Sequence, residues 1–465
     1  MSRQIAIDPI TRIEGHAKVL IDVDDDNTVS SAMFKVMDFR GFEAFLQGMQ
    51  VEMMPTLTAR ICGTCPVTHH VAASRAVDKV FGAAPPRTAE LMRYILNLGG
   101  LVSSHAVHFF ALAGPDLLLG LNADPAERNI LGMAKKYPSL AKGALRLRTI
   151  GQQIVELVGG RGTHPVSSVA GGMAEPLGKE KIESLQKLTA EGLELGQKLF
   201  SASKKILSNH KNTLLCSIPQ ETHSMGIVNN GLLDFYQGSL RLMKSDGSHH
   251  DFDEDTWASV ISEQAVDHSY GKYVFCNLAG EELPYRVGPL ARLNCVDSID
   301  TPLANKELEE FRADLGHPCH QTVAYHWARM IELLHGVEKL AVLAADEELR
   351  SDDVRSPLGS PRNATAHVEA PRGLLFHDYQ VDSNGIVTRA NLLVATQQNL
   401  SAINETIRLS AQHYLDKSDN ELLNAIEFGI RCYDPCLSCA THRVGEMQLE
   451  VLVRHQGEMI RHARK

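Results

Sequence analysis

Two Cys-x2-Cys pairs near opposite ends of the sequence constrain the fold more than any other feature. One pair is Cys62 and Cys65, and the other is Cys436 and Cys439. Four thiolates at this local spacing can close on a soft metal ion. For both pairs to bind one metal, distant parts of the chain must meet in the interior. The spacing therefore predicts a metal site at the centre of a large domain.

A structural zinc ion with four cysteine ligands is the simplest alternative for these pairs. Zinc ribbons usually place their pairs about 15–20 residues apart, whereas most of this chain separates Cys65 from Cys436. His317-Pro318-Cys319-His320 also looks like a metal motif, but no second pair completes it, so we interpret it as a decoy. The other cysteines stand singly, and we expect buried small side chains at Cys216, Cys276, Cys295, Cys319 and Cys432.

Composition predicts a soluble, cytoplasmic protein. The chain has 465 residues, of which 44% are hydrophobic, enough for a sizeable core. A net charge of −10 without a long basic run argues against nucleic acid and anionic membranes as partners. The first residues lack the apolar core of a signal peptide, and no later run reaches about 18 uninterrupted apolar residues. Nine cysteines, an odd number, fit reduced thiols or metal ligands in a reducing compartment.

Hydrophobic periodicity predicts mostly helices. Apolar residues recur every three to four positions across residues 91–112, 182–199 and 323–341, which indicates a helical bundle in the middle of the chain. Apolar alternation on both sides of residues 24–27 predicts a hairpin near the start.

A second β element is expected around Ser383-Asn384-Gly385, flanked by residues 367–380 and 386–396, with helices following to about Gly429. No linker or internal repeat interrupts the chain. We therefore expect an α+β fold, mainly α, with a central helical bundle and small peripheral β elements. It should form a single domain over residues 1–442.

Four short motifs in chain order resemble the large subunit of nickel-iron hydrogenases. Each is short enough to occur by chance, but the four together in this order are specific. The resemblance runs from about Ile5 to the C-terminus and implies the large-subunit fold of that family. The motifs are Arg12-Ile13-Glu14-Gly15-His16, the run from Arg60 through Cys62 and Cys65 to His69, Ala370-Pro371-Arg372-Gly373, and Asp434-Pro435-Cys436-x2-Cys439-x2-His442.

Other features resemble the soluble, bidirectional, NAD-linked branch of that family. They are Phe39-Arg40-Gly41-Phe42-Glu43, the run RVGPLARLN at residues 286–294 and the short chain. This resemblance implies two kinds of partner, an iron-sulfur small subunit and a diaphorase that carries flavin and NAD. No G-x-G-x-x-G fingerprint follows a strand here, which is consistent with NAD binding elsewhere. One departure is Ser104, which stands where many uptake enzymes carry an aspartate near the metals.

By this resemblance, Cys62, Cys65, Cys436 and Cys439 all bind nickel. Cys65 and Cys439 would also bridge to an iron that carries one carbon monoxide and two cyanides. Soft thiolates suit such a centre. Heterolytic cleavage of the substrate H2 needs a metal that accepts hydride and a nearby base that accepts the proton.

Three side chains are expected around this centre. The thiolates and cyanides outweigh two divalent metals, so a buried centre of net negative charge needs compensation. The resemblance assigns this positive charge to Arg372, which taken alone would be an ordinary loop residue. The hydroxyl of Thr396 would donate a hydrogen bond to a cyanide nitrogen. His69 follows Cys65 by one helical turn and would hydrogen-bond a ligating sulfur.

Glu14 is the candidate for the first proton carrier. A carboxyl group beside the terminal thiolate of Cys436 could exchange a proton over a short hydrogen bond, aided by a pKa raised through burial. Without the cysteine motifs, a salt bridge to Arg12 or a solvated carboxylate would be the favoured interpretation of Glu14.

A second, hard cation is expected near the C-terminus. Glu43 and His442 resemble ligands of Mg2+, completed by a backbone carbonyl near Leu400 and by water. In this family a dedicated endopeptidase removes the tail after nickel insertion, so we expect loss of residues 443–465 by cleavage after His442. Apolar alternation in that tail would alternatively fit a permanent edge strand. Maturation therefore implies the endopeptidase and nickel-insertion proteins as further partners.

Two alternatives to this function remain at this point. A non-catalytic relative would resemble the quinone-site subunit of respiratory complex I, but that branch lacks the cysteine pairs. A hydrogenase with another acceptor, such as ferredoxin, NADP or a heterodisulfide, would keep the same metal chemistry.

Overall fold

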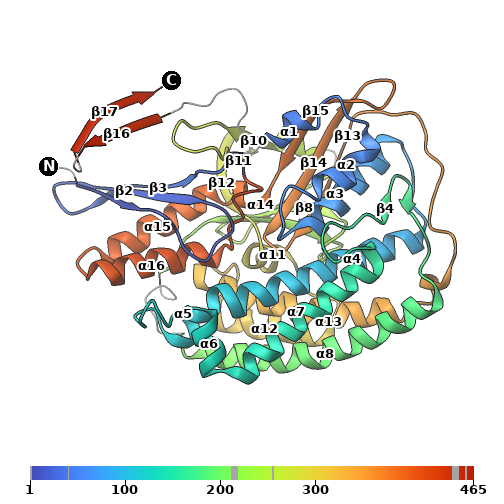
Figure 1. Cartoon of the computed structure of the whole chain (residues 1–465), viewed down its shortest axis with the longest axis horizontal. Coiled ribbons are helices and arrows are strands. Elements are labelled where there is room, and N and C mark those ends of the chain that lie inside the picture. The colour runs from blue at the N-terminus through green and yellow to red at the C-terminus, as the bar shows by residue number, and fades with distance from the viewer. Residues whose placement is uncertain are drawn as a thin grey trace.

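Four long helices pack into a bundle, three of them at the stretches where the periodicity predicts helices (Figure 1). The computed structural model describes residues 3–39, 41–210, 218–253, 256–441, 450–455 and 458–464. Two of these helices, over residues 87–107 and 138–159, pack closely at a pair of glycines. A Cβ atom added to Gly151 would lie 2.6 Å from the carbonyl oxygen of Gly99, so only glycine permits this contact. The four helices are α4 (Arg87–Val107), α7 (Pro138–Gly159), α8 (Lys179–Ser208) and α13 (Tyr325–Ala344).

The α4 region is the most apolar helical stretch. Residues Arg87–Leu119, which include the π-helix η2 (His108–Ala113) and α5 (Gly114–Leu119), are long and apolar enough to cross a membrane. However, 67% of that apolar window is buried inside the structure. This burial is what a core helix of a folded domain requires.

The predicted N-terminal hairpin is confirmed. Strands β1 (Arg3–Ile7), β2 (Ala17–Val23) and β3 (Val29–Val36) form an antiparallel sheet. The β2–β3 turn places Asn27 at φ 64°, and the Asp24 amide donates to the Thr28 carbonyl. Buried residues alternate along β2, so one face of this sheet packs on the core.

A seven-stranded sheet in the middle of the chain was not predicted. Its order is β10-β11-β12-β6-β8-β9, with β7 paired to β6, and only β12 and β6 pair in parallel. Its strands are β6 (His223–Asn229), β7 (Leu232–Leu233), β8 (Ser239–Met243), β9 (His249–Phe252), β10 (Ile261–Gln264), β11 (Tyr273–Leu278) and β12 (Glu281–Arg286).

The second predicted β element is an antiparallel sheet of β13 (Ala364–Ala370), β14 (Gly373–Val381) and β15 (Val387–Leu393). Helix α3 (Pro66–Val80), which follows the first cysteine pair, packs against β13 and β14. The tight β13–β14 turn therefore presents Pro371 and Arg372 beside the start of α3.

The C-terminal helices return the chain to its N-terminal segment. Helix α15 (Leu400–Tyr414) packs against β3, and α16 (Asp419–Cys432) begins at a capping box formed by Ser418 and Glu421. Beyond α16, the tail ends in an antiparallel hairpin of β16 (Glu450–His455) and β17 (Glu458–Arg464).

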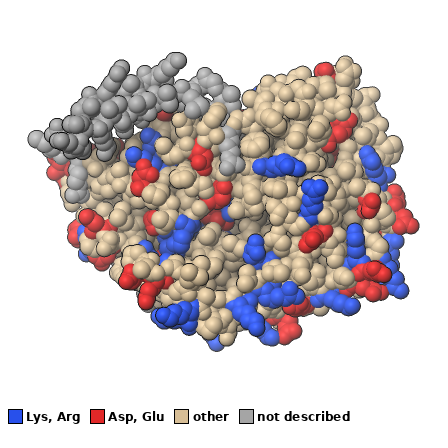
Figure 2. Space-filling view, in the orientation of Figure 1, with Lys and Arg blue, Asp and Glu red and all other residues tan. Residues whose placement is uncertain are grey.

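Shorter elements join these layers. One contiguous hydrophobic cluster extends from Ile7 to Ala440. Figure 2 shows Lys and Arg interspersed with Asp and Glu over the face in view. The short elements are α1 (Phe42–Phe45), η1 (Val51–Met53), α2 (Met54–Thr58), α6 (Ile130–Lys136), β4 (Ser168–Val169), β5 (Gly172–Met173), α10 (Trp257–Val260), α11 (Pro289–Cys295), α12 (Pro302–Leu315), η4 (Thr322–Ala324), η5 (Glu347–Arg350) and α14 (Ala395–Gln398).

Candidate metal centre

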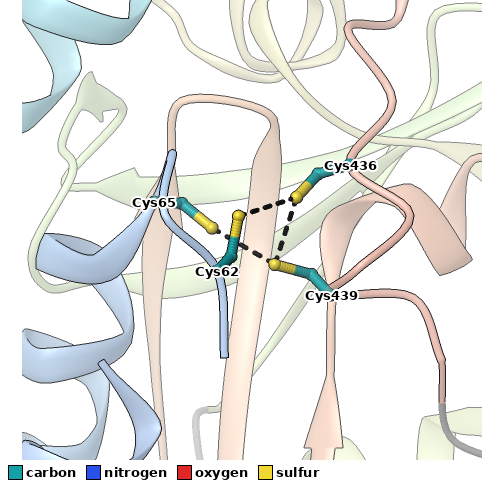
Figure 3. A group of neighbouring side chains, drawn as sticks. All are labelled: Cys62, Cys65, Cys436 and Cys439. Atoms are coloured by element: carbon teal, nitrogen blue, oxygen red, sulfur yellow. Dashed lines mark hydrogen bonds between the residues drawn. The ribbon is translucent and has the colours of Figure 1, made fainter. Parts of the chain in front are cut away.

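The four motif cysteines meet in the interior, as their spacing predicts. Their sulfur atoms all lie within 4.8 Å of one another, and all four residues are buried. Cys62 and Cys436 are 3.2 Å apart, as are Cys65 and Cys439 (Figure 3). Cys436 and Cys439 are also separated by 3.2 Å. One small ion could contact all four sulfurs.

Local structure explains how two distant segments place these sulfurs at one point. Cys65 is the N-cap of α3, and Pro66 starts that helix without losing a hydrogen bond. After α16, Asp434 adopts a left-handed φ of 53°, which turns the chain into the second pair. The N-terminal segment then pairs with it, because the Leu437 amide donates to the Glu14 carbonyl at 3.1 Å. The Thr396 hydroxyl accepts the Cys436 amide at 2.8 Å.

The electrostatics of the four thiols favour a bound cation. Contacts with Cys436, then with Cys62 and Cys65, together with burial raise the pKa of Cys439 well above that of a free thiol. In contrast, hydrogen bonds from Cys436, Cys439 and Cys65 lower the pKa of Cys62. Hydrogen bonds with Cys436 and Cys439 also lower the pKa of Cys65, to about 7, so the first pair ionises more readily than the second. A soft metal ion would allow all four to ionise, so these residues fit a metal centre.

Arg372 supplies a buried positive charge next to this cluster. Its Nε donates to the Asp434 carbonyl at 2.6 Å, and its Nη2 to the Asp434 carboxylate at 3.1 Å. Burial lowers the pKa of Arg372, but Asp434 and the sulfurs of the cluster together raise it well above the ordinary value. Its Nη1 has no hydrogen-bond partner among the described residues. This free donor can bind a further acceptor at the centre.

A small cavity of ≈ 20 Å³ adjoins the cluster on the side of Arg372 and Thr396. The Thr396 hydroxyl accepts the amide of Cys436, which leaves its own proton to donate. His69 also lines this cavity, and its Nε2 lies 3.5 Å from the Cys439 sulfur. All three side chains expected around the centre therefore line this cavity.

Glu14 lies beside Cys436 and not in a salt bridge with Arg12. The Cys436 sulfur is 3.1 Å from Glu14 Oε2, which also accepts the Ser438 amide at 3.0 Å. The Ser438 hydroxyl donates to the other carboxylate oxygen. Arg12 pairs instead with the buried Asp116. The position expected of a proton acceptor is thus occupied by a half-buried carboxylate.

A larger cavity of ≈ 350 Å³ opens above Glu14. Its wall is mainly apolar, with Thr64, Arg148 and Arg372 among the polar side chains that line it. Ser104 of α4 also lines it, which means that the residue departing from the family pattern does face this space. A hydroxyl therefore stands where a carboxylate would add negative charge.

The second predicted cation site is only partly described. Glu43 Oε1 accepts the amide of Leu392 in β15 at 2.9 Å. The amide and carbonyl of one strand residue point to the same side, so the Leu392 carbonyl also faces Glu43. Leu400 is instead the first residue of α15, where its carbonyl enters the helical hydrogen-bond ladder. His442 and the proposed cleavage site lie outside the described residues.

The isolated cysteines behave as buried small side chains. Burial raises the pKa of Cys276 to about 12 and also raises that of Cys319. The carbonyl of Cys319 accepts hydrogen bonds from Arg286 and Asn294. The motif at residues 317–320, which we interpreted as a decoy, therefore takes part in the hydrogen bonding of the core. Across the described ranges, the four motif cysteines form the one group with metal-ligand geometry. Cys295 and Cys432 are likewise buried free thiols, whereas Cys216 lies outside those ranges.

Several residues near the site were not singled out by the sequence. Asp434 and Ser438 lie inside the second cysteine motif and orient Arg372 and Glu14. Their position within this motif was the sequence signal that could have identified them. Arg292 donates to the carbonyls of Ala370 and Pro371 and so fixes the turn that carries Arg372.

Arg292 is held by a buried charge cluster. It contacts Glu332 and Glu369 at 2.6 Å each, with all three side chains fully buried. Burial raises the pKa of Glu369 to about 7, which shows the cost of placing this carboxyl in the core.

Replacing Arg292 by methionine should therefore leave two buried carboxylates without a counter-charge. We expect a loss of about 3–5 kcal/mol of stability, measured as a large fall in apparent Tm. The matched control is Arg146→Met, because Arg146 and Glu191 form an exposed pair worth about 1 kcal/mol or less. Equal Tm values for the two variants would contradict the role of the buried cluster.

These observations define a buried cluster of four thiols that can hold a metal, flanked by a buried arginine and by a carboxylate in contact with one sulfur. Residues 40–144 and 235–442 match the family model described as nickel-dependent hydrogenase, and residues 4–39 match one described as HoxL-like. The chain therefore belongs to the nickel-dependent hydrogenases. It is the large, catalytic subunit of a nickel-iron hydrogenase, the subunit that works with a small iron-sulfur subunit.

Individual relatives cover almost the whole chain. It is 39% identical to a subunit of the F420-non-reducing hydrogenase vhc from Methanococcus voltae, over 98% of this chain and 99% of that protein. It is 38% identical to the NAD-reducing hydrogenase HoxS subunit beta of Cupriavidus necator, over 97% of each. A solved NAD+-reducing [NiFe]-hydrogenase in the H2-reduced state matches with a TM-score of 0.91 and 36% identity, over 95% of this chain and 99% of that one.

A more distant structure shares the fold. The Ni-Fe-Se hydrogenase from D. vulgaris Hildenborough gives a TM-score of 0.78 at 24% identity, over 95% of this chain and all of that one. The predicted α+β class, mainly helical, is confirmed by these matches. Zinc would fit the four sulfurs by geometry alone, and the family membership identifies the centre as a nickel-iron one.

Proposed function

We propose that this subunit exchanges electrons between H2 and NAD+ within a soluble, cytoplasmic complex. Electrons would pass through the iron-sulfur small subunit to a diaphorase that carries flavin and NAD. The TM-score of 0.91 to an NAD+-reducing enzyme is the observation that most supports this acceptor. The archaeal F420-non-reducing relatives, at similar identity, support a second candidate with ferredoxin, NADP or a heterodisulfide as acceptor.

Acceptor assays on the purified complex separate these candidates. Under H2, we expect NAD+ to be reduced at a rate comparable to that with an artificial dye, and NADH to drive H2 release. A complex that reduces the dye and ferredoxin but not NAD+ would contradict the NAD linkage. That result would still be consistent with hydrogenase activity.

Each cysteine has a proposed role in holding the metals. Cys62, Cys65, Cys436 and Cys439 would bind nickel, and Cys65 and Cys439 would also bind the iron with its carbon monoxide and cyanides. When bound, this centre supplies the site at which H2 is split into protons and electrons. The proposal is supported by the four buried sulfurs within 4.8 Å of one another and by the raised pKa values of Cys436 and Cys439, which a bound cation would lower.

The surrounding residues would orient and neutralise this centre. The unpartnered Nη1 of Arg372 would face an iron ligand, and its fixed charge would offset the thiolates. The Thr396 hydroxyl, which holds the Cys436 amide, would direct its proton to a cyanide nitrogen. His69 would donate to the Cys439 sulfur. The buried walls of the small cavity leave little room for water there.

Glu14 would accept the proton that leaves the centre. Its Oε2 lies 3.1 Å from the Cys436 sulfur, within reach for direct transfer. Ser438 holds both oxygens in place through its amide and hydroxyl. The adjoining cavity, whose lining includes the hydroxyls of Thr64 and Ser104, would then carry the proton away.

The C-terminal maturation site and the Mg2+ site belong to the same proposal. Glu43 and the Leu392 carbonyl, in place of Leu400, would supply two oxygen ligands, and His442 would complete the site. Removal of residues 443–465 after His442 would let Cys439 settle on the metals. An intact mass that still includes Lys465 in the active complex would contradict this cleavage, and elemental analysis tests for magnesium.

A further inference from the structure

A chain of buried side chains extends from Cys439 away from the cluster. His69 Nε2 lies 3.5 Å from the Cys439 sulfur, and His69 Nδ1 lies 3.1 Å from His377 Nε2. His377 Nδ1 is in turn 2.7 Å from the hydroxyl of Tyr379. All three side chains are at most 1% exposed. The sequence places His377 and Tyr379 two residues apart on β14, so both point to the same face of the sheet.

The hydrogen bonds along this row of side chains can run in only two directions, toward Cys439 or away from it. A neutral imidazole donates from one nitrogen and accepts at the other, so the direction at one end fixes the direction throughout. A metal-bound thiolate has no proton to donate. Once Cys439 binds metal, His69 must donate to sulfur, His377 must donate to His69, and Tyr379 must donate to His377.

The environment of the outer two residues agrees with that direction. Burial, followed by the neighbouring His69, lowers the pKa of His377 well below its usual value, so His377 stays neutral. Burial also raises the pKa of Tyr379 well above its usual value, so the phenol keeps its proton. Within the described residues, His377 is the one hydrogen-bond partner recorded for the Tyr379 hydroxyl.

We propose that Tyr379 and His377 are positioning residues that lock His69 in the tautomer that donates to the Cys439 sulfur. This inference rests on the proposed function, because it requires Cys439 to be a metal ligand. A hydrogen bond to a ligating sulfur withdraws electron density from it and so tunes the attached metals. The phenol hydroxyl thereby acts on the centre through two imidazoles without touching it.

Tyr379→Phe tests the proposal, because it removes only the hydroxyl and keeps the packed ring. We expect unchanged nickel content, an iron-bound carbon monoxide band shifted to lower frequency, and H2 oxidation reduced by roughly tenfold. The shift follows because sulfur that loses its donor returns electron density to iron. His377→Phe should shift the same band further in the same direction.

Tyr273→Phe is the matched control. Tyr273 is also buried, and its hydroxyl accepts one hydrogen bond from Asn404 and shares another with His268, so the variant loses comparable contacts. Its band positions should equal those of the unmodified complex. Unshifted bands in both Tyr379→Phe and His377→Phe would overturn the proposal. Unshifted bands with loss of D2/H+ exchange would overturn it too, since the chain would then be a path for protons.

The same spectra separate this proposal from the one on which it rests. If the unmodified complex shows no carbon monoxide or cyanide bands, then the proposed nickel-iron-diatomic centre fails first. Bands that are present and insensitive to Tyr379 would reject only the donor chain.

Discussion

Cys436→Ala is expected to remove nickel from the protein and reduce H2 activity to the background level. The cluster has four sulfurs within 4.8 Å, so the loss of one leaves an open coordination position and only three thiolate ligands. Cys436 also contacts Glu14, the proposed proton acceptor, which would lose this contact. Elemental analysis and H2-dependent dye reduction on the purified complex measure both effects.

Cys276→Ala is the control for this variant. It makes the same chemical change in a fully buried cysteine that belongs to a different hydrophobic cluster. We expect full nickel content and near-normal activity, with at most a modest fall in Tm. Because insertion of nickel would precede tail cleavage, the Cys436→Ala chain should also keep residues 443–465 in its intact mass. Retention of nickel at normal stoichiometry in Cys436→Ala would remove the basis for the proposed centre.

Local patterns predicted the parts of the fold that have strong periodicity. The long helices α4, α8 and α13 carry apolar residues at regular helical spacing, and they formed where expected. The β2–β3 hairpin showed alternation and a turn-rich segment between its strands.

The seven-stranded sheet lacked such a pattern. Five consecutive residues of β6 are buried, and its sequence HSMGIVN contains serine and glycine, so period-two alternation is absent. Strand β9 is mostly exposed and rich in histidine. Most strands of this sheet pair with a neighbour along the chain, but the strands are short, and the β12–β6 pairing joins segments about sixty residues apart. A local window therefore cannot detect the sheet as a whole.

The same distinction applies to the site. Spacing alone predicted that the cysteines meet, because each Cys-x2-Cys pair offers two soft ligands at a separation that suits one metal ion. The buried cluster of Arg292, Glu332 and Glu369 has no local signature, since its members lie on three separate elements. The predicted Mg2+ site needs a backbone carbonyl, which every residue has, so the sequence could not choose between Leu392 and Leu400. The contact between Glu43 and Leu392 favours Leu392.

Glu14→Gln is expected to separate metal binding from proton transfer. Glutamine keeps the size of the side chain, and its amide oxygen can still accept from Ser438. It cannot accept the proton, however. We therefore expect normal nickel content and normal iron-bound carbon monoxide and cyanide bands. D2/H+ exchange and H2 turnover should fall by about 10²–10⁴-fold, the usual contribution of a positioned acid or base.

Asp38→Asn shows whether such a loss is specific to Glu14. Asp38 accepts the amide of His16 at 2.9 Å, so its replacement also removes a carboxylate from the same N-terminal segment. Its hydrogen bond ends on backbone and not on a cysteine sulfur, and exchange should stay near normal. If Glu14→Gln exchanged protons as fast as Asp38→Asn, the proton would have to leave Cys436 by another route. A lower exchange rate confined to Glu14→Gln would instead assign the first transfer to its carboxylate.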